Sequence, residues 1–304
     1  MSRLALVTGA YGFVGRHVAR ALAAQDVRVI GIGHGAWGRD EWRRWGIGEW
    51  HVADVTTDVL LTYSGEPDVV FHCAGSGSVA FSMTHPWQDF HRTVTTTLSV
   101  LEFIRLHHPD ARLVMPSSAG VYGVAETLPI SIGAPLNPVS PYGLHKKMAE
   151  ELCVSYGRHF GLRSALVRLF SVYGIGIRKQ LLWDACSKMA SGNAVFGGSG
   201  AETRDWIHVE DAAELLVLAA GAADAGCTVM NGAAGQAVTV RDVVDELAHS
   251  FGGVQVRFSG NARPGDPVNY QADISQAARL GWHAKRSWRE EMKNYADWFR
   301  KGAP

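Results

Sequence analysis

The sequence has few cysteines, no excess of charge of either sign and no long run of apolar residues. Its 304 residues contain four cysteines, Cys73, Cys153, Cys186 and Cys227, which lie far apart without a Cys-x-x-Cys pair. This spacing argues against a disulfide framework and against a zinc ribbon, and it favours a reducing compartment. We therefore expect a cytoplasmic protein that holds no metal.

The balanced charge argues against two further classes of partner. Lysine and arginine number 29, aspartate and glutamate also 29, and the formal net charge is zero. Such a chain lacks the electrostatic attraction that drives nonspecific binding to nucleic acid or acidic membranes. No apolar run reaches the roughly eighteen residues of a membrane span, and the opening MSRLALVTGA has no secretion-signal pattern. We expect neither a membrane nor a nucleic-acid partner.

The first thirty-five residues follow a pattern of strand, glycine-rich turn, helix and strand. Residues 3–8, RLALVT, and residues 27–32, VRVIGI, are apolar runs typical of strands buried in a parallel sheet. Gly9, Gly12 and Gly15 follow the first run and open a helical pattern. This order predicts the βαβ unit that binds dinucleotides, because side chains in the turn would keep the backbone N–H groups from the pyrophosphate.

The end of the second strand lacks the acidic residue that commonly holds the adenosine ribose of NAD. The chain instead has His34 between two glycines, followed by Arg39. Either side chain could bind the additional phosphate of NADP, or both could be solvated loop residues. Asp54, which follows the next apolar pair, could receive the adenine amino group. The choice between NAD and NADP therefore stays open.

Two later segments carry the residues of a reaction centre. Ser118 ends the apolar run at 111–118, and the ligand of an open α/β sheet lies beyond such strand ends. Tyr142 and Lys146 stand four positions apart at the start of a predicted helix, on one face. The ammonium and a cationic nicotinamide would favour the phenolate of Tyr142, a base, while Ser118 could hydrogen-bond the substrate oxygen. His72 is expected to be a buried histidine, because nothing near it in the sequence would orient it as a base.

These motifs resemble those of the extended short-chain dehydrogenase/reductases, most closely the nucleotide-sugar epimerase/dehydratase branch. The resemblance covers nearly the whole chain. It rests on Gly9-x-x-Gly12-x-x-Gly15, Ser118–Gly123, Pro141-Tyr142-x-x-x-Lys146, Val167–Gly174, Arg204–Asp211, Arg263–Asp266, Asp273–Ser275 and Leu280–Trp282.

The resemblance implies a role for each matching position. Tyr142 is the expected general base, Lys146 the ligand of the nicotinamide ribose and Ser118 the partner of the substrate hydroxyl. Ser171 and Thr93 stand where relatives often have asparagine. The expected substrate-binding residues are Ser76, Ser118, Ala119, Ser171, Arg204, Arg263 and Asp266, the two arginines holding the diphosphate. The expected cofactor-binding residues are Gly9, Tyr11, Gly12, Phe13, Gly15, His34, Arg39, Asp54, Val55, Cys73, Ala74, Gly75, Tyr142 and Lys146.

The residues beside Ser118 limit which reaction of the family the chain can catalyse. Dehydratases of the branch carry an Asp–Glu pair there, and this chain has Ala119 and Gly120, which cannot transfer protons. The remaining groups suffice for an NAD(P)-dependent nucleotide-sugar 4-epimerase that works through a transient 4-keto sugar, with NAD favoured. A 4-ketoreductase using NAD(P)H is the alternative, and a catalytically silent nucleotide-binding relative is a third hypothesis.

The expected architecture is α/β, a doubly wound parallel Rossmann sheet over residues 1–174 with a smaller α/β lobe over 175–304. Later segments of the chain are expected to return to the first domain. The lobe should hold a nucleotide-diphosphate sugar. By analogy with the family, the chain should form a homodimer through two helices, 89–106 and 144–160.

Overall fold

The central element is a seven-stranded parallel sheet. The computed structural model describes residues 3–260 and 269–302. The strands are β1 (Leu4–Thr8), β2 (Arg28–Gly33), β3 (Glu49–Val52), β4 (Val69–His72), β5 (Arg112–Ser118), β6 (Ser164–Leu169) and β10 (Thr228–Gly232). Their order is β10-β6-β5-β4-β1-β2-β3, and every neighbouring pair is parallel. The predicted doubly wound Rossmann sheet is confirmed.

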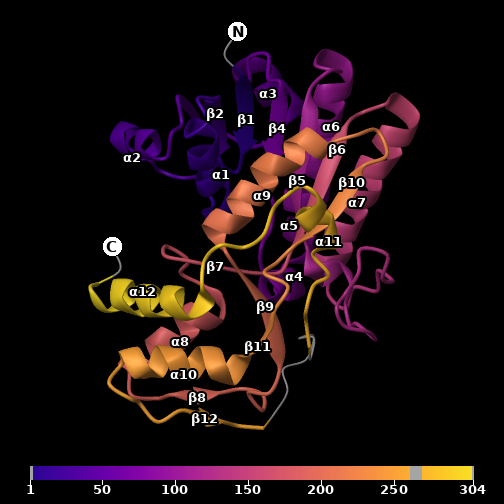
Figure 1. The fold of residues 1–304 in the computed structure, drawn as a ribbon. Helices are drawn as coiled ribbons and strands as arrows, with labels where there is room; N and C mark the ends of the chain where they lie inside the picture. The colour runs from indigo at the N-terminus through magenta and orange to yellow at the C-terminus, as the bar shows by residue number, and fades with distance from the viewer. Residues whose placement is uncertain (1–2, 261–268, 303–304) are drawn as a thin grey trace.

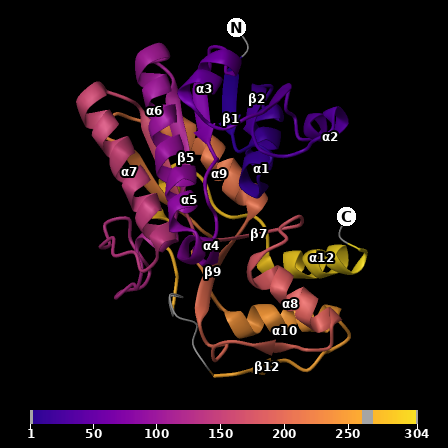
Figure 2. The ribbon, with the colours of Figure 1, turned by 180° about the vertical axis from the view of Figure 1, so that it is seen from behind.

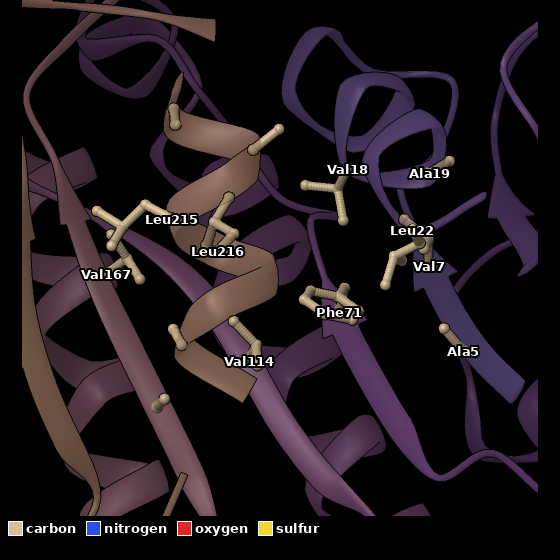
Figure 3. Packing of buried hydrophobic residues seen from close by; sticks show 14 of the residues in the cluster. Ala5, Val7, Val18, Ala19, Leu22, Phe71, Val114, Val167, Leu215 and Leu216 are labelled. Atoms are coloured by element: carbon tan, nitrogen blue, oxygen red, sulfur yellow. The ribbon is translucent and has the colours of Figure 1, made fainter. Parts of the chain in front are cut away.

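Both faces of the sheet are covered, because its strands are apolar on both sides. Ala5 and Val7 of β1 face a core under α1 (Phe13–Ala23) and α9 (Val209–Ala222), to which Leu216 belongs (Figure 3). Leu6 faces the opposite core, under α3 (Thr57–Tyr63), α6 (Thr96–His107) and α7 (Pro141–Phe160). Figure 1 shows α9 crossing the first face, and Figure 2 shows α6 and α7 side by side on the other.

The segment between β4 and β5 is more broken than its apolar spacing predicts. The sequence predicts one continuous helix over 89–106. The structure instead has α4 (Val79–Thr84), α5 (Pro86–Phe90), a π-helical turn over His91–Thr95 and then α6. A π turn adds a residue to the helical turn and commonly lies near a functional site. Here it lies between β4 and the start of α7.

A smaller body lies beyond the carboxyl ends of the sheet strands (Figure 1). Its elements are the sheet of β7 (Ser171–Tyr173), β9 (Thr203–His208) and β11 (Ala237–Thr239), the pair β8 (Val195–Phe196) and β12 (Arg257–Phe258), and the helices α8 (Gln180–Ala190), α10 (Val240–Ser250) and α12 (Trp288–Arg300). They enclose a core of their own around Tyr173, Trp206 and Tyr295. α9, β10 and α11 (Ser275–Arg279) return to the first body, β10 as the edge strand beside β6.

One short helix, α2 (Arg39–Arg44), follows β2, and a single 3-10 turn, Ala119–Val121, follows β5. Within residues 3–260 and 269–302, no helix has the length and apolar character needed to cross a membrane.

Candidate active site

Two positions of the turn after β1, Gly9 and Gly15, have no space for a side chain. Gly9 has φ +67°, and a Cβ built on it would lie 2.5 Å from the backbone nitrogen of Ala74. A Cβ on Gly15 would lie 2.4 Å from the carbonyl oxygen of Gly9. The turn leads directly into the amino end of α1, where backbone N–H groups and the helix dipole favour an anion. This cradle fits the pyrophosphate of a dinucleotide.

Two further residues of the predicted turn lie at its rim. Tyr11 is partly exposed, and its ring meets Trp37 edge-on at a centroid distance of 4.8 Å. Phe13 packs against the core of the smaller body instead. It therefore links the glycine turn to the part of the chain beyond the sheet.

The end of β4 lies directly against this turn. The backbone N–H of Ala74 donates to Oγ1 of Thr8 at 3.3 Å, and the same hydroxyl bonds Nδ1 of His72 at 2.8 Å. His72 is buried, and burial lowers its pKa to about 3. It is a neutral structural histidine, as the sequence suggests. Cys73 and Gly75 follow on the same strand end.

Helix α7, which carries the predicted Tyr142 and Lys146, starts beside that strand end. The hydroxyl of Ser140 accepts a hydrogen bond from the backbone N–H of Gly143 at 3.2 Å and caps the helix, and Pro141 fills its first position. Four residues after Tyr142, the buried Lys146 donates from Nζ to the carbonyl oxygen of Pro116 at 3.2 Å. A Cβ on Gly75 would lie 3.7 Å from that same Nζ. Lys146 thus faces the predicted cofactor side.

The Ser118 hydroxyl and the Tyr142 ring lie around the same point, since a Cβ built on Gly120 would be 3.3 Å from the one and 3.5 Å from the other. Burial raises the pKa of Tyr142 above its ordinary value of 10, the nearby Ser118 hydroxyl lowers it, and the charge of Asp89 raises it. Burial also lowers the pKa of Lys146, which Cys73, Asp89 and Glu150 raise. The sequence assigns the stabilisation of the phenolate to Lys146 together with a cationic nicotinamide; among the groups of the protein, Ser118 lowers the pKa of Tyr142.

Residue 120 faces Ser118 and Tyr142, whereas residue 119 does not. A Cβ on Gly120 would lie 3.3 Å from Oγ of Ser118 and 3.5 Å from the Tyr142 ring. Ala119 is instead buried in an apolar cluster with Tyr122. An acidic side chain at position 120 would therefore reach the reacting groups, and this chain has only a hydrogen atom there.

The predicted adenosine-side residues meet at the ends of β2 and β3. Nε2 of His34 lies 2.7 Å from Oδ1 of Asp54, and both side chains are exposed. The pair brings a carboxylate next to the end of β2, where the sequence itself has none. Val55 is buried in the core under α3, and Arg39 is exposed at the first position of α2.

The predicted substrate residues lie at the carboxyl edge of the sheet and on β7 and β9. The backbone N–H of Ser76 donates to Oγ1 of Thr93, on the π turn, at 3.4 Å. Ser171 begins β7 and pairs with Trp206 of β9. Arg204, also on β9, donates to the carbonyl oxygen of Thr203 at 2.8 Å. Arg263 and Asp266 lie outside the described residues.

Four residues that support the site escape the sequence reasoning. They are Thr8, Ser82, Asp89 and His145. Ser82 and Asp89 belong to the short helices α4 and α5, far from α7 in the sequence. For these residues the one signal in the sequence is His145, directly before Lys146. Its partner Asp89 is identified only by the fold.

Comparisons with known proteins agree with this geometry. A model of the NAD dependent epimerase/dehydratase family matches residues 5–231. The UDP-glucose 4-epimerase of Azospirillum brasilense is 31% identical over 92% of this chain and 87% of its own. The UDP-glucose 4-epimerase of Thermotoga maritima, solved with UDP-glucose, superposes with a TM-score of 0.88 at 25% identity, covering 99% of this chain and 100% of its own.

A second solved structure, MoeE5 in complex with UDP-glucose and NAD, has a TM-score of 0.86 at 28% identity and covers 99% of both chains. The match of the family model extends from β1 to β10 and so includes the glycine turn, Ser118, Tyr142 and Lys146. The chain belongs to the NAD-dependent epimerase/dehydratase family.

Proposed function

We propose that the chain is an NAD-dependent nucleotide-sugar 4-epimerase acting on a UDP-sugar. The observation that carries the proposal is the Ser118–Tyr142–Lys146 arrangement beside the glycine turn, with glycine at the one neighbouring position that faces it. Two proteins that the chain resembles are named UDP-glucose 4-epimerases, and a third, MoeE5, was solved with UDP-glucose and NAD.

Each residue of the site has its own role in the proposed reaction. Tyr142 removes the proton of the sugar 4-hydroxyl, and Ser118 hydrogen-bonds the same oxygen as it becomes a carbonyl. Lys146 holds the nicotinamide ribose. NAD bound there would supply the hydride exchange with C4 of the sugar, accepting the C4 hydrogen with two electrons and returning both. Tyr142 then gives the proton back to the oxygen after the 4-keto sugar has turned over, so that the configuration at C4 is inverted.

The surroundings of Gly120 limit what else can happen to the 4-keto sugar. Elimination of water across C5 and C6 needs an acid and a base at positions 119 and 120. Ala119 is buried and apolar, and Gly120 has no side chain. The keto sugar is therefore reduced again and not dehydrated.

We favour NAD over NADP because of the position of the Asp54 carboxylate. Its carboxylate bonds His34 at the end of β2, and a carboxylate there would repel the additional phosphate of NADP. The four free cysteines are in keeping with a reducing, cytoplasmic compartment, where such sugars serve carbohydrate biosynthesis.

The decisive experiment is incubation of the purified protein with UDP-, GDP- and dTDP-hexoses. We expect the C4 stereoisomer of a UDP-hexose to form without added NAD(P)H, and co-purified NAD to be detected by mass spectrometry. If no stereoisomer forms but a 4-keto sugar is reduced when NAD(P)H is supplied, the chain is a ketoreductase. Bound cofactor without turnover of any sugar nucleotide would identify a silent relative.

We propose that the part of the chain after residue 174, apart from the segments that return to the first body, holds the nucleotide-diphosphate sugar against the sheet edge. Arg204 of β9 supplies a cation on that side. It lies close enough to Tyr270 for its charge to oppose the effect of burial, which raises the pKa of Tyr270 to about 12. Replacing Arg204 with alanine should raise KM more than it lowers kcat, because a diphosphate contact is made in ground and transition state alike.

We also propose a homodimer through α6 and α7. These helices lie side by side, and four of their apolar side chains are 41–55% exposed: Leu98, Leu106, Leu144 and Phe160. Exposed apolar side chains on neighbouring helices are typical of a protein interface. Gel filtration should give the mass of two chains, and Leu98→Glu should reduce it to one. A single-chain mass for the wild-type protein at micromolar concentration would rule out the dimer.

A further inference from the structure

A buried acid–histidine pair lies behind Tyr142 and Lys146, and the mechanism above does not use it. Nδ1 of His145 donates a hydrogen bond to Oδ2 of Asp89 at 2.6 Å. Asp89 has no exposed surface, and His145 retains 7%. His145 directly precedes Lys146 on α7, whereas Asp89 lies on α5, which packs against α7. The pair therefore ties the catalytic helix to the broken segment after β4.

Burial of the Asp89 carboxylate costs free energy of folding. Its second carboxylate oxygen, Oδ1, has no hydrogen-bond partner among the described residues. The ring of Phe90 meets His145 edge-on at 5.4 Å and adds an apolar wall. A buried carboxylate with an unsatisfied oxygen destabilises a protein compared with an apolar replacement of similar size. Stability alone does not account for this pair, so a role in the adjacent site is the better explanation.

The other titratable groups on the sheet side of Lys146 carry no unbalanced negative charge. Burial raises the pKa of Cys73 to about 12 and lowers that of His72 to about 3, so both are neutral near pH 7. Glu150, one turn further along α7, is paired with Arg168, whose Nη2 lies 2.7 Å from Oε2 of Glu150.

The π turn and α4 contribute three more titratable groups. His91 packs edge-on against Trp87, and His85 stacks on Phe81. The guanidinium of Arg92 lies 4.8 Å from the centroid of the Phe81 ring. Each of these side chains contacts an aromatic ring, and none forms an ion pair with Asp89 in the part of the chain that the structure describes.

We propose that Asp89 is a positioning residue that supplies the fixed negative charge behind Lys146, and that His145 holds its carboxylate in place. For its place in catalysis the inference rests on the proposed epimerase function. The charge stabilises the Lys146 ammonium against burial, and it opposes ionisation of Tyr142. Both groups therefore keep their protons to higher pH than they would without Asp89.

The direct test is an NMR titration of isotope-labelled lysine in the purified full-length protein. The Lys146 signal is identified by its loss in Lys146→Met. We expect Asp89→Asn, which keeps the shape of the side chain, to move the Lys146 midpoint down by on the order of half a pH unit or more. Asp58→Asn, on the exposed start of α3, is the matched control and should leave the midpoint unchanged.

The histidine variants test the second half of the proposal. His145→Asn retains an N–H donor near the Nδ1 position, and His145→Leu does not. We expect the first to keep the wild-type midpoint and the second to lower it, because an unbonded buried carboxylate is disfavoured. His145→Leu also serves if Asp89→Asn does not fold.

The pH profile of epimerase activity gives the catalytic readout. We expect both limbs to move to lower pH in Asp89→Asn, so that kcat rises on the acidic side of the wild-type optimum and falls on its basic side. If Asp89→Asn lowers the melting temperature but leaves the Lys146 midpoint unchanged, the Asp89–His145 pair only stabilises the fold, and the proposal is wrong. Absence of activity in the wild-type protein would refute the proposed function alone, since the NMR titration needs no turnover.

Discussion

The backbone N–H of Tyr142 donates a hydrogen bond to Oγ of Ser82 at 3.0 Å, across sixty positions of the sequence. Ser82 is fully buried on α4, and its own hydroxyl donates to the carbonyl oxygen of Val79 at 2.7 Å. The first turn of α7 is thereby fixed to the segment that follows β4. This contact places the expected general base next to the strand end that faces the glycine turn.

Tyr142→Phe tests the role of the phenol. Removing the hydroxyl should lower kcat by roughly a hundred- to ten-thousandfold, the usual contribution of a general acid–base group. The backbone contact to Ser82 is kept, so the melting temperature should change little. Steady-state kinetics and thermal unfolding measure the two effects. Retention of most of the turnover would remove Tyr142 from the role of base.

Ser118→Ala should shift the pH dependence in the opposite direction to Asp89→Asn. The Ser118 hydroxyl lowers the pKa of Tyr142, so its loss raises that pKa further above 10. The base must be ionised to act, and the acidic limb of the kcat profile therefore moves to higher pH. Measurement of kcat across pH decides this. An unchanged profile would mean that Ser118 does not stabilise the phenolate.

Gly15→Ala should abolish cofactor binding. The added Cβ would lie 2.4 Å from the carbonyl oxygen of Gly9, so the turn must open. Gly161→Ala is the matched control, because Gly161 ends α7 with φ +71° and has no neighbour within 4 Å. The control should lose about 1 kcal/mol of stability and keep its NAD. The NAD content after purification separates the two variants, and equal content in both would contradict the expectation.

Arg168→Met should destabilise the fold strongly. Arg168 and Glu150 form a buried ion pair with side chains 6% and 5% exposed, and Arg168 also donates to the hydroxyl of Tyr122 at 3.0 Å. Removing one member leaves a buried carboxylate unpaired, which typically costs about 3–5 kcal/mol. Urea unfolding measures the loss.

The double variant Arg168→Met with Glu150→Gln provides the check on that explanation. It removes the unpaired charge and should recover part of the lost free energy of unfolding. If the double variant is no more stable than the single one, the loss comes from packing around Arg168 and not from the charge.

Several features of this protein follow from the sequence alone, because they depend on neighbouring residues. The apolar run at residues 3–8 and the three glycines behind it predict a strand, a tight turn and a helix that the structure confirms. The spacing of Tyr142 and Lys146 puts both on one face of α7 wherever that helix lies. The family resemblance also follows from such local motifs.

The tertiary structure decides what is brought together from distant positions. Asp54 meets His34 because parallel strands gather their carboxyl ends at one edge of the sheet, and Asp89 meets His145 because α5 packs against α7. The predicted helix is divided into α5, a π turn and α6, and all three contact α7. Local pattern fixes the helices, strands and turns, since their hydrogen bonds join near neighbours. Charge balance and proton affinity at the site depend on burial and on partners far along the chain, which no local pattern contains.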